Sequence, residues 1–294
     1  MTTHAAVPVR HGLLSISAAA VAWGTGGAVA VLLLRTGGLG PVAVCAWRFA
    51  VAAGCLALLP VLRRTARGRG AGAPRRAAVL TGLGLAVSQC AYFGSVQYAG
   101  LGPGTLVTIG AGPVLTGLGA HLLLGERLTG RAAAAIVLAL GGLALLVAAP
   151  AAGPRPELGL ALAVLAGAGQ SGLTLWARGG GSARASTGAF ATGLLCLLPL
   201  ALAEGGVLPG AGEPLLTAGA LLFLGTVPTL FAYRWYFAGL TVVPGATAAV
   251  LVLLEPATAA VLGVACFGEP LTPALPAGSA LLLTAVAVLT RGTR

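Results

Sequence analysis

The pair Glu255–Pro256 is the most unusual feature of the sequence, because it lies in an otherwise apolar stretch, LEPATAAVLGVACF, at residues 254–267. If this stretch spans a membrane, a carboxylate there is costly to bury and is expected to face protein or a water-filled cavity. It could recognise an amine or carry a coupled proton, and structural packing or pairing is the alternative. Proline removes a backbone hydrogen bond, so Pro256 predicts either an opening of the helix beside the carboxylate or a packing kink.

Arg48 is the other charged residue that falls clearly inside an apolar stretch, about 10 Å from its start at 1.5 Å per residue. An ion pair between Arg48 and Glu255 would offset the desolvation of both charges. Pro113 and Pro228 lie in two further apolar stretches. Together with Pro256 they are the candidate hinges, since each can bend or locally open a helix.

Uncharged polar and aromatic side chains recur at helical spacing in several of the apolar stretches. Gln89 and Tyr92 are three residues apart, and Gln170 and Thr174 are one turn apart. Such stripes could line a wet or ligand-filled centre, although a Ser or Thr can also simply bond to its own helix backbone. The candidate substrate-binding residues, in chain order, are Trp23, Arg48, Gln89, Tyr92, Thr108, Gln170, Thr174, Tyr233 and Glu255.

Composition indicates that a membrane must position these residues. The chain has 294 residues, of which 57% are hydrophobic and 8% charged, and its mean hydropathy is +0.98. Soluble domains carry about 25% charged residues. A spanning helix needs about 20 mostly apolar residues, and lipid offers no partners for an extended backbone. The sequence therefore predicts an all-α membrane protein with ten transmembrane helices.

The predicted spans, in chain order, are residues 11–34, 41–62, 77–98, 103–124, 129–149, 157–177, 185–203, 215–237, 244–267 and 271–290. Residues 1–30 also fit a secretory signal, with AVA at 28–30 as a cleavage motif. We expect the first span to be retained, because its apolar run continues through Leu34.

The arginines predict the orientation of the chain, because basic residues near membrane ends mark the cytoplasmic side. With the N-terminus inside, 13 of the 17 arginines fall on inner segments, and only Arg35 and Arg155 fall on outer loops. We therefore expect a multi-pass protein of the cell (inner) membrane with both termini in the cytoplasm. The loop from Arg63 to Arg76 holds six arginines. It is expected to contact anionic lipids, with a partner site as the alternative. This distribution explains the net charge of +11 without nucleic acid.

The sequence contains no recognisable catalytic set. It has no Asp, and of its three histidines His121 lies inside a predicted span and His11 is the first residue of another. The spacing from His121 to Glu126 is not that of a metallopeptidase. The five cysteines form no C-x-x-C pair and are interpreted as small buried apolar groups. We expect no enzyme activity, cofactor or metal site, and no domain that could hydrolyse ATP is evident.

An internal repeat relates residues 111–130 to residues 254–273. A constant offset of 143 residues pairs Pro113 with Pro256 and Glu126 with Glu269. Glu126 follows Gly125 at a predicted helix end, where we expect its carboxylate to serve the N-terminus of the following helix.

The repeat predicts two halves, residues 1–149 and residues 150–294, each with five helices. Because five is odd, the second half must enter the membrane in the opposite direction. Inverted repeats of this kind place substrate sites near the midplane of transporters, often at broken helices.

Two segments, PVLTGLGAHLLLGERLT (113–129) and LEPATAAVLGVACFGEPLT (254–272), resemble the paired helix-ending motifs of the EamA-type drug/metabolite transporters. AWG (22–24), WRF (47–49) and AYRWYFAGL (232–240) fit the same pattern, so the resemblance covers nearly the whole chain. It implies a central cavity walled by the first four spans of each half, with the fifth and tenth spans outside. The family includes exporters of amino acids and related small metabolites. AGAGQSG (166–172) departs from many relatives, which have an aromatic residue there.

These observations predict a secondary transporter that exports amino acids or related small polar metabolites across the inner membrane by alternating access. The first alternative is a proton-coupled exporter of lipophilic cations or drugs, with Glu255 as the cation and proton site. The alternative from another class is a membrane-embedded enzyme or accessory protein. The expected partners are a small-molecule substrate and the lipid bilayer, and proton coupling and a homodimer stay open.

Overall fold

The computed structural model describes residues 8–36, 38–62, 75–99, 101–127, 129–146, 154–180, 186–205, 207–210, 213–267 and 274–290. Within these ranges, every regular element is a helix. The arginines between Arg63 and Arg69, and Glu269 of the repeat, lie outside the described residues. Arg75 and Arg76 begin the helix α3 and are exposed.

The first half of the chain forms five helices, namely α1 (Val9–Thr36), α2 (Pro41–Leu62), α3 (Arg75–Ala99), α4 (Leu101–Leu124) and α5 (Gly130–Leu146). The second half begins with α6 (Pro156–Arg178) and α7 (Thr187–Glu204). It continues with α8 (Pro214–Gly225), the π-helix η1 (Thr226–Phe231), α9 (Ala232–Gly239), α10 (Gly245–Leu251), α11 (Leu254–Phe267) and α12 (Ala274–Thr290).

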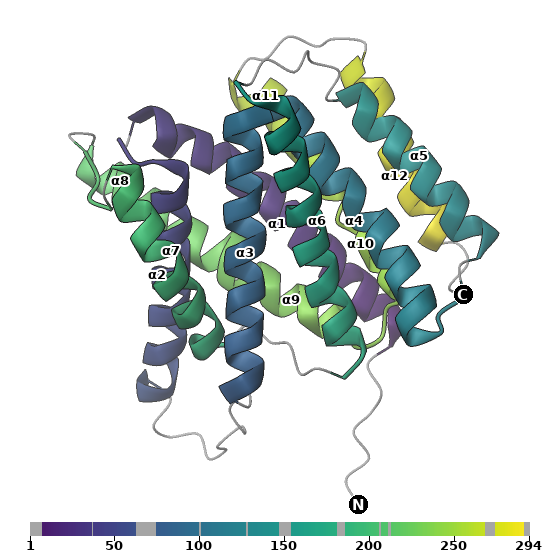
Figure 1. The fold of residues 1–294 in the computed structure, drawn as a ribbon, viewed down its shortest axis with the longest axis horizontal. Coiled ribbons are helices and arrows are strands. Elements are labelled where there is room, and N and C mark those ends of the chain that lie inside the picture. The colour runs from purple at the N-terminus through teal and green to yellow at the C-terminus, as the bar shows by residue number, and fades with distance from the viewer. Residues whose placement is uncertain are drawn as a thin grey trace, which may run out of the picture.

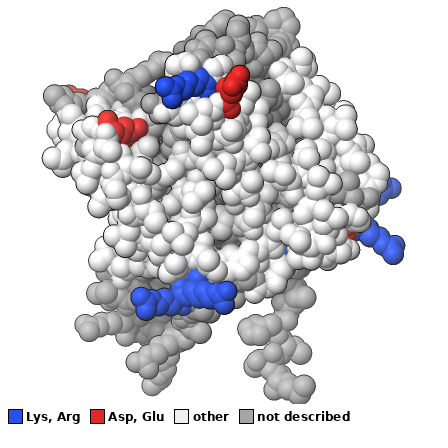
Figure 2. All heavy atoms as spheres, viewed as in Figure 1, with Lys and Arg blue, Asp and Glu red and all other residues white. Residues whose placement is uncertain are grey.

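The helices are suited to a membrane. Among the described residues, six helical stretches are long and apolar enough to cross one, and two shorter apolar helices cover Gly130–Gly142 and Gly245–Thr258. Large apolar side chains such as Leu122 and Val137 are exposed on the outside of the bundle. In the view of Figure 2, the surface is almost free of charged side chains between its two ends. The chain is therefore a multi-pass membrane protein.

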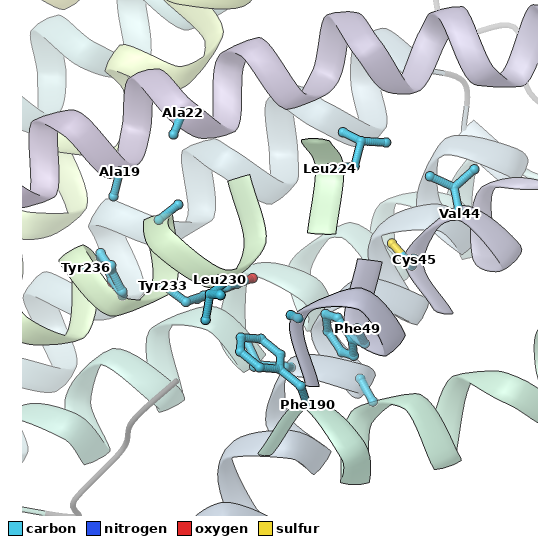
Figure 3. Close-up of a cluster of buried hydrophobic side chains, with 14 of the residues drawn as sticks. Ala19, Ala22, Val44, Cys45, Phe49, Phe190, Leu224, Leu230, Tyr233 and Tyr236 are labelled. Carbon is cyan, nitrogen blue, oxygen red and sulfur yellow. The ribbon is translucent and has the colours of Figure 1, made fainter. Parts of the chain in front are cut away.

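The two halves of the chain pack against each other rather than folding apart. α1 contacts α9 and α11, α2 contacts α7, and both α3 and α4 contact α6. The main core lies between these helices and includes Ile16 and Leu85. Phe49, Phe190 and Tyr236 also belong to it and are labelled in Figure 3. Because its members come from both halves, the core joins the two.

α5 and α12 form a separate pair at one edge of the bundle (Figure 1). Between them and α10–α11 lies a second, smaller core that includes Ala132, Ala135, Ala139 and Ala285. Small residues let helix backbones approach closely where no hydrophobic effect drives association. This pair therefore lies outside the main core.

Two of the predicted spans are interrupted near their middles. The predicted span 215–237 consists of α8, the π-helix η1 and α9, with Pro228 inside η1. The predicted span 244–267 consists of α10 and α11, which are separated by a turn at residues 252–253 just before Glu255 and Pro256. By contrast, α4 runs through Pro113 without a break.

Candidate functional site

The interruption at η1 holds a charged side chain in place. Pro228 lacks an N–H group, so the carbonyl of Leu224, four residues earlier, loses its usual helical donor. The hydroxyl of Thr229 donates to that carbonyl instead, over 2.7 Å. Arg48 Nε in turn donates to Thr229 Oγ1 over 3.0 Å. The Thr229 hydroxyl, which replaces the missing backbone donor, therefore also holds Arg48.

A second set of contacts links Arg48 to α3. Arg48 Nη1 lies 3.9 Å from Cys45 Sγ, one turn earlier on α2. The Cys45 thiol donates to Gln89 Oε1 over 3.4 Å. Arg48, Cys45 and Gln89 thus form a polar strip that runs from η1 across α2 to α3. Cys45 is buried in the core, as its interpretation as a small buried group implies, and its thiol in addition takes part in this strip.

An aromatic cluster lies beside this strip, between α1, α7 and α9. The Trp23 ring lies 5.3 Å from the rings of both Tyr233 and Tyr236, in edge-on and tilted arrangements. The Phe190 ring lies 6.2 Å from the Tyr233 ring, and both tyrosines and Phe190 are among the buried side chains labelled in Figure 3. Such edge-on contacts between aromatic rings are favourable. The cluster brings Trp23 and Tyr233, predicted from separate halves, into contact.

Two residues of α6 join this cluster through hydrogen bonds. The Thr174 hydroxyl donates to the Gln170 carbonyl over 2.9 Å, and it lies 2.5 Å from the Tyr236 hydroxyl. Because Thr174 has a single hydrogen to donate, Tyr236 is the donor in their contact. Gln170 and Thr174 therefore belong to the same cluster as Trp23.

Two buried polar atoms in the described residues have no hydrogen-bond partner, Trp23 Nε1 and Thr108 Oγ1. Most buried polar groups in proteins are hydrogen-bonded, so each exception calls for a reason. Thr108 lies on α4 where that helix closely approaches Gly167 of α6. A bound molecule could form a hydrogen bond with either atom. Trp23 Nε1 lies within the aromatic cluster itself.

Glu255 occupies the interrupted second span, as the second residue of α11. Pro256 cannot donate to the carbonyl of Val252, and the backbone N–H of Glu255 donates to it instead, over 2.9 Å. The Glu255 side chain is half-buried, and no described residue donates a hydrogen bond to its carboxylate. The carboxylate is therefore available to a ligand.

α1 places Glu255 beside the aromatic cluster. A Cβ atom on Gly24 would lie 2.6 Å from the Glu255 carbonyl oxygen, so only glycine fits this approach. The preceding residue is Trp23 of the cluster. Arg48 interacts electrostatically with Glu255. Among the described residues, however, the two do not form an ion pair, since Arg48 hydrogen-bonds to Thr229 instead.

The remaining candidate, Tyr92, packs against Phe93 with ring centres 5.3 Å apart. Residues outside the predicted set also take part in the site, above all Thr229 and Cys45. The sequence holds a signal for each, because Thr229 directly follows Pro228 and Cys45 precedes Arg48 by one helical turn. The contacts themselves depend on tertiary packing.

One expectation at a helix end is wrong. Glu126 does not serve the N-terminus of α5, where Thr129 Oγ1 instead accepts a hydrogen bond from Ala132 N over 3.2 Å. Glu126 forms an ion pair with Arg178 at the end of α6, with Arg178 Nη2 2.6 Å from Glu126 Oε1. A distant helix, and not the next one along the chain, provides its partner.

The EamA-like transporter family matches residues 10–148 and again residues 157–291. The uncharacterized transporter YwfM of Bacillus subtilis is 29% identical over 287 residues, which cover 96% of this chain and 94% of that protein. The uncharacterized protein PA1977 of Pseudomonas aeruginosa is 35% identical over 287 residues and 96% of each chain.

A solved crystal structure shares the fold, with a TM-score of 0.80 at 23% identity, over 95% of this chain and 98% of the other. The family model thus covers nearly the whole chain in two successive matches. The chain belongs to the EamA-like transporter family.

Proposed function

We propose that this transporter exports amino acids or related small polar metabolites across the inner membrane by alternating access. The proposed architecture has ten membrane spans in two inverted repeats, residues 1–149 and 150–294. The two successive family matches support the repeat. The count of ten follows if α8, η1 and α9 make one span and α10 and α11 another.

The proposed substrate site is the region between Arg48, Glu255 and the aromatic cluster. One observation carries this assignment: an unpartnered donor, Trp23 Nε1, is buried in a cluster to which α1, α6 and α9 all contribute. A cationic side chain, Arg48, and a carboxylate without a hydrogen-bond donor, Glu255, flank it. A zwitterion could direct its carboxylate towards Arg48 and its ammonium towards Glu255.

Alternating access requires the two halves to move relative to each other around this site. The interruptions at η1 and at residues 252–253 lie in spans that contribute Tyr233 and Glu255 to the site. Of the three candidate hinge prolines, we assign the hinge role to Pro256 with the turn at residues 252–253. η1, which contains Pro228 and is tied to Arg48, is then a fixed support, and α4 runs through Pro113 without a break. The substrate site and the hinge then share the span that contains Glu255, so that binding and motion are coupled.

A second candidate function is the export of lipophilic cations or drugs, coupled to protons. The contacts of Trp23 with Tyr233 and Tyr236 favour it, because aromatic faces next to a carboxylate attract organic cations. In this version Glu255 binds either the cation or a proton. The Arg48 guanidinium argues against it, because it repels a cation that approaches the same region.

Orientation and surroundings complete the proposal. Both termini lie in the cytoplasm, and Arg75 and Arg76 contact anionic lipids at that surface. Figure 2 shows basic side chains at both ends of this face, and those at the lower end, where α3 begins in the same view of Figure 1, fit this orientation. A homodimer is compatible with the exposed apolar surface of the bundle, and its presence can be measured directly in detergent.

Counterflow in proteoliposomes tests the proposal. Vesicles that contain the purified protein are loaded with one unlabelled compound from a panel of amino acids, nucleobases and organic cations, and uptake of the labelled compound is followed. Glu255→Gln is expected to lower the flux about tenfold or more, because it removes the charge that meets the ammonium group. Glu157→Gln is the matched control, since Glu157 is exposed at the start of α6.

The outcomes separate the alternatives. Flux of amino acids that is lost in Glu255→Gln supports the main proposal, and flux of organic cations that depends on a pH gradient supports the second. Flux that persists in Glu255→Gln would remove Glu255 from the site. If well-folded protein carries none of the panel, the chain is an accessory protein or a membrane-embedded enzyme, or its substrate lies outside these classes.

A further inference from the structure

Four residues that are far apart in the sequence meet at one end of the bundle. Arg178 Nε and Nη2 both donate to Glu126 Oε1, over 3.0 and 2.6 Å. Arg178 Nη1 donates to the Leu240 carbonyl over 3.0 Å. The Gly245 backbone N–H donates to Glu126 Oε2 over 3.1 Å. We call Glu126, Arg178, Leu240 and Gly245 the end junction.

The end junction is saturated with hydrogen bonds. Both carboxylate oxygens of Glu126 and all three guanidinium nitrogens of Arg178 are engaged, which suits the planar donor fork of arginine. The backbone of Glu126 is held as well, since its N–H donates to Ala120 O and its carbonyl contacts His121 Nδ1, both over 3.0 Å. The end junction therefore ties the ends of α4, α6 and α9 to the start of α10.

The end junction lies one helical turn beyond two residues of the aromatic cluster. Arg178 follows Thr174 by one turn of α6, and Leu240 follows Tyr236 by one turn at the end of α9. Thr174 and Tyr236 hydrogen-bond to each other. The end junction therefore lies about 6 Å beyond this contact along both helices, at 1.5 Å per residue. It lies between the cluster and this end of the bundle.

The end junction connects the two halves of the chain. Glu126 comes from the first half of the chain, whereas Arg178, Leu240 and Gly245 come from the second. Separating the halves at this end would break the contacts that cross between them, namely the ion pair between Arg178 and Glu126 and the hydrogen bond from Gly245 to Glu126. The side chains of Arg178 and Glu126 are 19% and 20% exposed. Water can therefore solvate both charges when they part, as it could not for a fully buried pair.

We propose that the end junction is a latch, which closes the substrate site towards the cytoplasm and is broken and remade in each transport cycle. This inference rests on the proposed function, because it assumes that the aromatic cluster contains the substrate site. The latch assigns Arg178 and Glu126 to conformational control and not to substrate binding. Their substitution should therefore change which side of the site is open.

The test measures access to two buried positions at opposite ends of the second half. Thr247 lies two residues beyond Gly245, next to the latch, and Thr217 lies near the start of α8, at the other end of the α8–α9 span. Each is replaced by cysteine in a background without native cysteines. A membrane-impermeant maleimide then labels the protein from each side of oriented vesicles.

Glu126→Gln and Arg178→Gln are expected to speed labelling at Thr247→Cys about tenfold and to slow labelling at Thr217→Cys, because opening one end favours closure of the other. Arg178→Lys should give an intermediate rate, since lysine keeps the charge but lacks the fork. It also serves if the neutral variants fold poorly. Arg127→Gln is the matched control, because Arg127 is the exposed neighbour of Glu126.

Unchanged labelling in variants that unfold at the wild-type temperature would overturn the latch. Faster labelling at both positions would also overturn it, because that pattern is general loosening. If the two positions respond in opposite directions while the wild-type protein transports nothing from the panel, the latch stands as a conformational device and the proposed transport function fails.

Discussion

The two interrupted spans differ in the group that replaces a hydrogen-bond donor missing at a proline. Pro228 and Pro256 each deprive a carbonyl four residues earlier of its donor. At η1 a side chain makes the repair, from Thr229 Oγ1 to Leu224 O, and the same hydroxyl accepts from Arg48. Between α10 and α11 the backbone makes it, from Glu255 N to Val252 O. The first repair fixes a charged side chain, and the second leaves the Glu255 carboxylate unbound by the described residues.

This difference assigns a distinct role to each interruption. A side-chain repair that also holds Arg48 is rigid, because moving η1 would break two linked hydrogen bonds. A backbone repair at a turn can open without breaking contacts to another helix. We therefore regard η1 as the fixed support of the site and the turn at residues 252–253 as its movable part.

The strongest test of the comparison is Thr229→Val, which keeps the shape of the side chain and removes its hydroxyl. The Leu224 carbonyl and Arg48 Nε both lose a partner, and each unsatisfied buried group costs about 1–3 kcal/mol. We expect the free energy of unfolding in detergent to fall by about 2–4 kcal/mol. Thr226→Val is the control, because its hydroxyl bonds only to carbonyls of its own helix.

A double substitution sharpens this result. In Pro228→Ala/Thr229→Val the new N–H at residue 228 can donate to the Leu224 carbonyl again. The double variant should recover about 1 kcal/mol or more relative to Thr229→Val alone. If it recovers nothing, the hydroxyl of Thr229 does not replace the donor that Pro228 lacks, and the account of η1 is wrong.

A smaller effect is expected where α1 packs against the second interruption. A methyl group at residue 24 would lie 2.6 Å from both the Glu255 carbonyl and Thr258 Cβ. Gly24→Ala should therefore lower the unfolding free energy by about 1–3 kcal/mol through overpacking. Gly54→Ala on α2 meets nothing within 4 Å and should be neutral or slightly stabilising. Equal effects of the two substitutions would contradict the close contact between α1 and α11.

The smallest change in stability belongs to Pro256→Ala. Restoring the N–H lets α10 and α11 join, so the unfolding free energy should change by no more than about 1 kcal/mol. The flux in counterflow should nevertheless fall several-fold, because a hinge is lost. Pro113→Ala provides the comparison, since α4 is already continuous there and its flux should stay within about twofold. A larger loss at Pro113 would reverse the assignment of the movable part.

The sequence carried most of the information about the elements and less about the contacts between them. The span predicted at 244–267 coincides closely with α10 and α11, because apolar length and composition are local properties. The partner of Arg48 was not predictable in this way. Whether it meets Glu255 or Thr229 depends on how far each helix is rotated, and neither hydropathy nor spacing determines that rotation.

The partner of Glu126 was likewise not predictable from the sequence. Its place at a helix end was evident from the sequence, and a carboxylate there suggested a role for the next helix. The structure gives it Arg178 instead, 52 residues away. Only the packing of α4 against α6 brings the two together. The sequence could therefore identify the residues with unusual chemistry but not the residues that complete them.

The pairing of α5 with α12 has a consequence for the order in which the protein assembles. The alanines of α5 that form the smaller core are covered by α10, α11 and α12, all of which are synthesised later. From Leu146 to Thr290 the ribosome needs on the order of ten seconds. During that time the alanine face of α5 is exposed to lipid. The edge of the bundle formed by α5 and α12 is thus the last to be completed during biosynthesis.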